Sequence, residues 1–538
     1  MRCFITCLVT FVFFATTTTS VVAQNNIFGM HVSSNFTDDF KTAAELVNSN
    51  GGDWGYVTVV IQENNRNNAQ WQQIFNQMRE LHLIPIVRIA TGASGKSWRR
   101  SDVDQLPHWA SFLNGLNWPV KNRYVVLFNE PNHGTEWGGV CDPIDYGRVA
   151  LEYAKTLKST HEDFFVMLAG LDQSTPQIPP YYCDEGNFLQ VLFSKYPQLT
   201  DYIDGLASHS YPNPGFLGNP SDTGKGTVAG YIWELEVLKN LGVVKSLPVF
   251  ITETSWPTGR GFYSEEKVIE YTKQAFENLW KNDPRVNAVT LFDINIGGSL
   301  AKFSLKNEDG SLKKVAYAIQ ELTKNAGIPR QSDSAQILTD LPKKMKAGDT
   351  FKSAISIVNT GQSIWDEKSD FQIKITGLNY PISISQLPLT KPNEVGHVDI
   401  SFTPTVGVHE ASIFLTKDGN QVEEIGKWGF EIVKPPIIHI EIDGHLALSE
   451  EIEIQIYDKD ERLLYKNPIV IISRGKGKID DFISGNEGER YRMVVLKKRY
   501  LPRQNHFELQ KIGNVVNFQK MLGVDLDQDG QFTLGDVF

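Results

Sequence analysis

The strongest constraint on this chain's fold is a strand-then-helix pattern that repeats eight times between residues 25 and 328. The strand segments are nearly continuous apolar runs, which is typical of parallel strands buried on both faces. Their starts lie 28 to 43 residues apart, so each interval can hold a crossover helix. The eight expected strands are Phe28–Val32, Tyr56–Ile61, Ile84–Ile89, Tyr124–Asn129, Phe164–Gly170, Asp204–Tyr211, Leu247–Glu253 and Val286–Asp293.

The intervening segments carry helical patterns. Ser264 is a suitable N-cap for the amphipathic stretch Glu265–Trp280. Another stretch, Ala69–His82, has Trp71, Ile74, Phe75 and Met78 on one face. Eight strand–helix units predict an α/β fold, a (β/α)8 TIM barrel. The alternative is a doubly wound open sheet, which usually has a glycine-rich phosphate loop after its first strand, and none follows Val32.

Residues 1–23 have the features of a secretory signal peptide. One positive charge precedes an apolar run from Phe4 to Ala15, and small residues precede Gln24. The run is too short to span a bilayer comfortably, and no other stretch is long and apolar enough. We therefore expect an exported protein, secreted or at the cell surface, without membrane association once the signal is removed; a signal anchor is the alternative.

Two cysteines, Cys141 and Cys183, remain after the signal peptide. An even count in an oxidising compartment permits one disulfide between them. Two free buried thiols are the alternative, because the spacing does not show whether the pair is close in space.

The charge balance argues against one class of partner. The chain has 52 basic and 63 acidic residues, a formal net charge of −11, whereas nucleic-acid binding needs a basic face. The aromatic content of 11% fits stacking on sugars, and it fits large packed cores equally well. We expect no nucleic-acid partner, and the aromatic content leaves a carbohydrate partner open.

Beyond a polar linker at residues 329–334 the pattern changes to short alternating segments separated by turn signals. These predict two smaller all-β modules, a β-sandwich at 335–434 and a second module at 437–519. The expected order is a signal peptide (1–23), a barrel (24–328), the two β modules, and a short acidic tail (520–538).

Two predicted strands end in a glutamate. The fourth runs into Asn129-Glu130-Pro131 and the seventh ends at Glu253. The carboxyl ends of barrel strands meet at one face, where active sites lie. Two carboxylates about 5–5.5 Å apart at such a face are what retaining glycoside hydrolysis requires. Burying a carboxylate for structure alone is costly, which favours a catalytic role over a structural ion pair.

This arrangement resembles the superfamily of retaining (β/α)8-barrel glycoside hydrolases (clan A type), over roughly residues 25–328. The resemblance implies that Glu130 is the acid/base, that Glu253 is the nucleophile, and that Asn129 binds the sugar 2-hydroxyl. It also implies that catalysis needs no cofactor.

Further residues carry over from the same resemblance. His209 and Tyr211 are similar to a strand-six motif whose hydroxyl orients the nucleophile, and Arg88 to a basic residue that keeps the nucleophile ionised. Trp256 would offer a stacking face. Two more substrate-binding residues are expected from their strand-end positions rather than from the resemblance, namely His31, at the end of strand one, and Asp293, at the end of strand eight. For all of these a structural role in the core is the alternative.

One departure from the superfamily lies at strand eight. Many members carry a tryptophan at its end, whereas this chain has Phe292-Asp293.

The loop after Glu130 holds further polar residues that we expect at the rim of the site, namely Asn132, His133 and Glu136.

The modules after the barrel resemble accessory parts of secreted enzymes. Asn359-Thr360-Gly361 followed by Trp365 is similar to immunoglobulin-like modules, for which we expect a spacer role rather than carbohydrate binding. The tail resembles a dockerin calcium loop and would bind a structural Ca²⁺ and, in a longer natural protein, a cohesin-like partner. A solvated acidic tail is the alternative, because only one loop is present. The expected ligands are Asp525, Asp527, Asp529, Gln531 and Asp536.

The sequence thus predicts a secreted hydrolase that cleaves a β-linked glycoside or polysaccharide with retention. One alternative is a non-catalytic glycan-binding barrel. Another is a scaffold or adhesion protein whose β modules carry the function.

Overall fold

The computed structural model describes residues 25–33, 37–444, 447–523 and the single residues 525, 531 and 533. The predicted signal peptide lies outside the described residues. Two compact units divide between Ser332 and Asp333. No helix among the described residues combines the length and apolar character that a membrane crossing requires.

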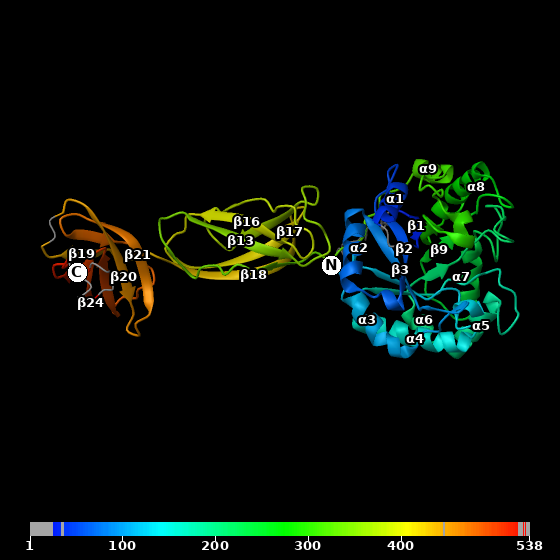
Figure 1. Ribbon diagram of the computed structural model, residues 1–538, viewed down its shortest axis with the longest axis horizontal. Coiled ribbons are helices and arrows are strands. Elements are labelled where there is room, and N and C mark those ends of the chain that lie inside the picture. The colour runs from blue at the N-terminus through cyan, green and yellow to red at the C-terminus, as the bar shows by residue number, and fades with distance from the viewer. Residues whose placement is uncertain are drawn as a thin grey trace, which may run out of the picture. The chain divides into compact units, whose positions relative to one another are not determined.

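The first unit is an eight-stranded parallel barrel (Figure 1). The strand order is β7-β6-β3-β2-β1-β10-β9-β8. Bridges from Met167 to Gly205 and from Asp172 to His209 join the two outermost strands, so the sheet closes into a ring. The predicted (β/α)8 barrel is confirmed. The strands are β1 (Phe28–Val32), β2 (Gly55–Gln62), β3 (Leu83–Ala90), β6 (Arg123–Leu127), β7 (Phe164–Leu168), β8 (Leu206–Ser208), β9 (Val249–Thr254) and β10 (Val286–Leu291).

Helices surround the ring (Figure 1). In α2, Trp71, Ile74, Phe75 and Met78 are all buried, as the helical pattern predicts. Ser264 caps α8 by accepting a hydrogen bond from the backbone N–H of Lys267. The helices are α1 (Thr37–Val47), α2 (Asn68–Glu80), α3 (Leu106–Asn114), α4 (Pro143–Thr160), α5 (Glu185–Lys195), α6 (Leu199–Tyr202), α7 (Gly230–Asn240), α8 (Glu265–Asn278) and α9 (Lys314–Glu321).

The barrel strands read as continuous apolar runs because they border two cores. Side chains alternate along a strand, so each strand contributes to both the inside and the outside of the ring. The inner core holds Tyr56, Ile84, Ile86, Tyr124, Val126, Met167, Ala207, Phe250 and Ala288. The outer core, shared with the helices, includes Val57, Val87, Val125, Val166, Ile251 and Val289.

The second unit is all-β. One pair of sheets shares a core that includes Ile355, Ile400, Ile413 and Trp365. Its sheets have the orders β11-β13-β16-β15 and β12-β18-β17-β14. The strands are β11 (Ala335–Ile337), β12 (Lys344–Lys346), β13 (Phe351–Asn359), β14 (Phe371–Thr376), β15 (Ser383–Ile384), β16 (Val395–Phe402), β17 (Gly407–Lys417) and β18 (Asn420–Val433).

A further pair of sheets follows, with the orders β22-β19-β25 and β21-β20-β23-β24. Its core includes Ile440, Ile454 and Met493. The strands are β19 (Ile438–Ile442), β20 (Glu450–Tyr457), β21 (Leu463–Ile472), β22 (Lys476–Ile479), β23 (Arg490–Lys497), β24 (Tyr500–Glu508) and β25 (Asn514–Phe518). Of the expected calcium ligands, Asp527, Asp529 and Asp536 lie outside the described residues, so the calcium loop stays a prediction.

We expect residues 25–332 to fold as an independent unit, because the barrel closes on itself and its core is complete within this range. A chain that ends at Ser332 should unfold cooperatively, and calorimetry is the measurement. A broad, non-cooperative transition for this fragment, with a sharp one for the full chain, would show that the barrel depends on the second unit.

Candidate active site

Glu130 lies just beyond β6, where the chain makes a sharp turn. Phe128 and Glu130 both have positive φ, at 73° and 32°, and the backbone N–H of Glu130 donates to the carbonyl of Gly170 at 3.1 Å. Left-handed backbone costs a non-glycine residue about 1 kcal/mol or more, and such strain is concentrated at functional sites. The turn leaves the Glu130 side chain partly open to solvent, with one fifth of it exposed.

Glu253 lies on β9, and its side chain is nearly buried among donors from other strands. Arg88 on β3 donates to its Oε1, and the Nε2 of His31 on β1 lies 3.6 Å from the same oxygen. The hydroxyl of Tyr211, just after β8, donates to Oε2 at 3.1 Å. The closed ring therefore brings three strand ends to one carboxylate.

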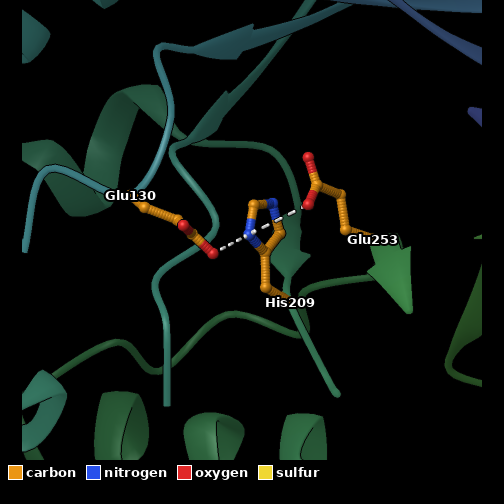
Figure 2. Close-up of side chains that lie close together, drawn as sticks. All are labelled: Glu130, His209 and Glu253. Carbon is orange, nitrogen blue, oxygen red and sulfur yellow. Dashed lines mark hydrogen bonds and ion pairs between the residues drawn. The ribbon is translucent and has the colours of Figure 1, made fainter. Parts of the chain in front are cut away.

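The imidazole of His209 lies between the two carboxylates (Figure 2). Its Nδ1 is 2.7 Å from Oε1 of Glu130 and 3.9 Å from Oε2 of Glu253. One carboxylate oxygen of Glu130 lies within 4.8 Å of one carboxylate oxygen of Glu253. The two carboxylates predicted from the strand ends thus meet across a gap of a few ångströms.

The charges around Glu253 keep it ionised. Burial alone raises the pKa of its carboxyl, but the charges of His209, Arg88 and His31 outweigh burial and lower the pKa to about 2. Burial has the opposite effect on His209, whose pKa it lowers. The charge of Glu253 and the hydrogen bond to Glu130 overcome this and raise the pKa of His209.

Hydrogen bonds hold both the oxygen and the nitrogen of the Asn129 side-chain amide. Its Oδ1 accepts from Arg88 at 2.7 Å, and its Nδ2 donates to Glu136 at 3.2 Å. Burial and the charge of Glu130 raise the pKa of Glu136. A polar chain therefore runs from Glu253 through Arg88 and Asn129 to the loop that holds Glu136.

Glu130 and Glu253 open into a cavity of about 540 Å³. Its walls combine the polar residues described above with aromatic rings and apolar side chains, a composition typical of sites for small ligands. The aromatic lining residues are Trp98, Phe128, Trp137, Tyr211, Phe216, Phe292 and Phe303.

Several cavity residues escaped the sequence analysis. Trp98 lies in the hairpin formed by β4 (Ala93–Ser94) and β5 (Ser97–Trp98), and Phe216 lies in the loop after β8. No periodic pattern marks such loop residues. Asp172, which binds Nε2 of His133 at 2.8 Å, follows the expected fifth strand, so the strand-end rule could have found it.

Trp256 does not have the predicted role. Its side chain is 2% exposed, packs edge-on against Tyr271, and donates from Nε1 to the carbonyl of Gly218 at 2.9 Å. The ring belongs to the packed core and has no face open to a sugar.

Three other residues expected to bind substrate are buried among polar partners, with Asp293 against His31 and Ser33. His31, His209 and Asp293 are each at most 1% exposed. His209 bridges the two glutamates, whereas His31 contacts both Glu253 and Asp293. Asn129 and Arg88, by contrast, line the cavity.

A disulfide holds the loop that follows Glu130. The structure joins Cys141 to Cys183, with their Cα atoms 6.1 Å apart. Backbone hydrogen bonds run from Cys183 to Asn132 at 2.9 Å and from Gly134 to Tyr181 at 2.7 Å. The disulfide therefore fastens together the two loops that carry Glu136 and Asp172.

Glu130, His209 and Glu253 are close enough together to be considered as metal ligands. The Arg88 guanidinium, however, already neutralises Glu253, and a second cation there would be repelled. The donor set is that of an ion-paired acid pair rather than of a metal centre.

No protein-family model and no curated protein matches this chain. The chain is similar to several solved structures. A GH128 (subgroup II) endo-β-1,3-glucanase from Pseudomonas viridiflava is 14% identical, with 56% of this chain and 98% of that chain covered and a TM-score of 0.38.

Two further solved structures are similar. A β-mannanase from Thermomonospora fusca is 14% identical, with 55% and 88% covered and a TM-score of 0.36. A family 51 α-L-arabinofuranosidase from Bifidobacterium longum is 11% identical, with 88% and 96% covered and a TM-score of 0.38. At these TM-scores we base the function on the geometry of the site.

Replacing both Cys141 and Cys183 by alanine should lower the free energy of unfolding by about 2–4 kcal/mol, because the disulfide closes a long loop. The two residues are 42 positions apart. Urea unfolding of the oxidised protein and the double variant is the measurement, and equal free energies would contradict the prediction.

Gly170→Ala should displace His209. A Cβ at this position would lie 2.3 Å from the His209 ring, which is held between two carboxylates and cannot move freely. We expect a destabilisation of about 1–3 kcal/mol. Thermal unfolding is the measurement.

Gly297→Ala is the matched control, because its backbone φ is −105° and its Cβ would have no atom within 4 Å. The prediction is wrong if the two alanine variants unfold at the same temperature.

Proposed function

We propose that the barrel is a retaining glycoside hydrolase that acts on a β-linked glycoside or polysaccharide. The observation that carries the proposal is the facing pair Glu130 and Glu253 at the mouth of the barrel, with one oxygen of each within 4.8 Å of the other. Retaining enzymes hold their two carboxyl groups about 5–5.5 Å apart, whereas inverting enzymes need about 6.5–9.5 Å to admit a water molecule.

The different surroundings of the two carboxylates support their assigned roles. Glu253 is buried and ionised, which suits a nucleophile. Glu130 is partly exposed and hydrogen-bonded to His209, which suits a group that exchanges a proton with substrate and water. The two residues are both glutamates, so their different roles come from their different surroundings.

In the first step an oxygen of Glu253 bonds to the anomeric carbon, while Glu130 gives its proton to the departing glycosidic oxygen. In the second step Glu130 takes a proton from water. The resulting hydroxide oxygen bonds to the anomeric carbon, and the Glu253 carboxylate leaves with its electron pair. Arg88 and Tyr211 hold Glu253 throughout, and the two glutamates and water carry every proton and electron pair in both steps.

The proposal includes export to an oxidising compartment. The Cys141–Cys183 disulfide and the signal-like first 23 residues support it. The proposal also includes Ca²⁺ binding by the acidic tail and, in a longer natural protein, a cohesin-like partner. Calorimetric titration of the full chain with Ca²⁺ tests the first.

A non-catalytic glycan-binding barrel is the alternative. A site that only binds sugar does not require a buried carboxylate that an arginine and two imidazoles keep ionised. Removing such a charge from water costs free energy. This cost favours the catalytic proposal.

The stereochemistry of the reaction tests the mechanism. Across a panel of aryl β-glycosides and β-linked polysaccharides, proton NMR should show the β-anomer as the first product. Glu253→Ala should lower kcat by several orders of magnitude. Glu130→Ala should lower kcat/KM on the order of 10²–10⁴-fold for poor leaving groups, and much less for leaving groups that need no proton.

Azide separates the two roles. With Glu253→Ala, azide should attack from the face left open by the missing carboxylate and give an α-glycosyl azide. With Glu130→Ala it should attack the glycosyl-enzyme and give a β-glycosyl azide. If both variants bind glycan and wild-type protein turns nothing over, the binding-barrel alternative is correct.

A further inference from the structure

His31 faces two buried carboxylates at once. It lies on β1, is 0% exposed, and has Oδ2 of Asp293 2.8 Å from its Nδ1. Its Nε2 lies 3.6 Å from Oε1 of Glu253 and has no hydrogen-bond partner of its own. The ring also packs against Phe292, with centroids 4.9 Å apart.

Asp293 is equally buried and is held in place from several sides. Its Oδ2 accepts from the Ser33 hydroxyl at 2.6 Å as well as facing His31, and its Oδ1 accepts from the backbone N–H of Asn295 at 2.8 Å. The backbone N–H of Ile294 donates to the carbonyl of His31 at 3.1 Å. These bonds fix the carboxylate, and through it the plane of the imidazole.

A carboxylate bonded to Nδ1 determines which way a histidine points its other nitrogen. Because Asp293 faces Nδ1, Nε2 is directed at Glu253. At 3.6 Å this nitrogen lies beyond hydrogen-bond distance of Oε1, so it acts on the Glu253 carboxylate as a close electrostatic contact. The arrangement thus aims one ring nitrogen at Glu253.

The polar groups around Glu253 divide between its two oxygens. Oε1 faces Arg88 and His31, whereas Oε2 faces Tyr211 and, at 3.9 Å, His209. His209 connects this side to Glu130. The other titratable groups nearby are Glu136, across Asn129, and Asp293, across His31.

We propose that His31, held by Asp293, is a positioning residue that fixes the Glu253 carboxylate through Oε1 and directs Oε2 at the anomeric carbon. This inference rests on the proposed function. When the glycosyl-enzyme forms through Oε2, Oε1 becomes its carbonyl oxygen, still facing Arg88 and His31. The negative charge returns to Glu253 when the ester breaks, so these donors assist the second step as well as the first.

The test compares Asp293→Asn and His31→Phe with a matched control. Asp53→Asn is suitable, because Asp53 forms a similar pair with His82 (Oδ1 to Nδ1, 2.7 Å) far from the cavity. Both site variants should lower kcat/KM about 10–100-fold. They should also move the acid limb of the kcat/KM profile upward by about one pH unit or more. His31→Gln, which keeps a polar donor at this position, should fall in between.

A second measurement does not depend on activity. Titration of the ¹³C-labelled Glu253 carboxyl by NMR, assigned with Glu253→Gln, should give a higher pKa in Asp293→Asn than in wild type or Asp53→Asn. Since Asp293→Asn preserves volume, it also decides the matter if His31→Phe fails to fold.

The outcomes separate the two proposals. Retaining hydrolysis by wild type, with the acid limb and the Glu253 titration unchanged in both site variants, overturns the role of His31 alone. A wild-type protein without hydrolytic activity overturns the proposed function, while the NMR titration still reports whether His31 and Asp293 control the charge of Glu253.

Discussion

The site depends on the interactions that stabilise the buried negative charge of Glu253. A carboxylate this deeply buried is stable only if compensating donors surround it, and here they come from β1, β3 and the segment after β8. Those elements are far apart in sequence, and only a closed ring brings their ends together. An open sheet would leave some of these donors distant and the charge uncompensated. Barrel closure and the ionised carboxylate therefore require each other.

His209 couples this charge to the second glutamate. Its Nδ1 lies near both carboxylates, so a change in charge on either one is felt by the imidazole. Gly170 makes room for that ring, because any side chain there would collide with it. The backbone of Gly170 also receives the N–H of Glu130, so one residue sets the position of both partners. The residues that connect the acid pair, Gly170 and His209, thus lie at the seam where β7 meets β8 and the barrel closes.

Strand periodicity made the barrel and its two acids predictable. Apolar runs mark where each strand ends, and strand ends mark where a barrel places its site, so the positions of Glu130 and Glu253 followed from the pattern, whereas Arg88 was expected only from the resemblance. Trp256 shows the limit of this reasoning: it follows the same strand as Glu253, but its ring turns outward into the core around Tyr271. Trp98 and Phe216 were not predicted because loop conformation has no period. The partnership of His31 with Asp293 spans 262 residues and depends on β1 and β10 being neighbours.

The two residues that follow β10, Phe292 and Asp293, occupy different parts of the site. Phe292 and Asp293 point in different directions: Phe292 lines the cavity, whereas Asp293 is buried against His31. Phe292 packs edge-on against Phe303, which in turn packs against Phe216, and the three rings form one apolar wall. The carboxylate of Asp293 lies on the other side of this strand end, 2.8 Å from the His31 ring. Two adjacent residues thereby line the cavity and hold His31 from the same strand end.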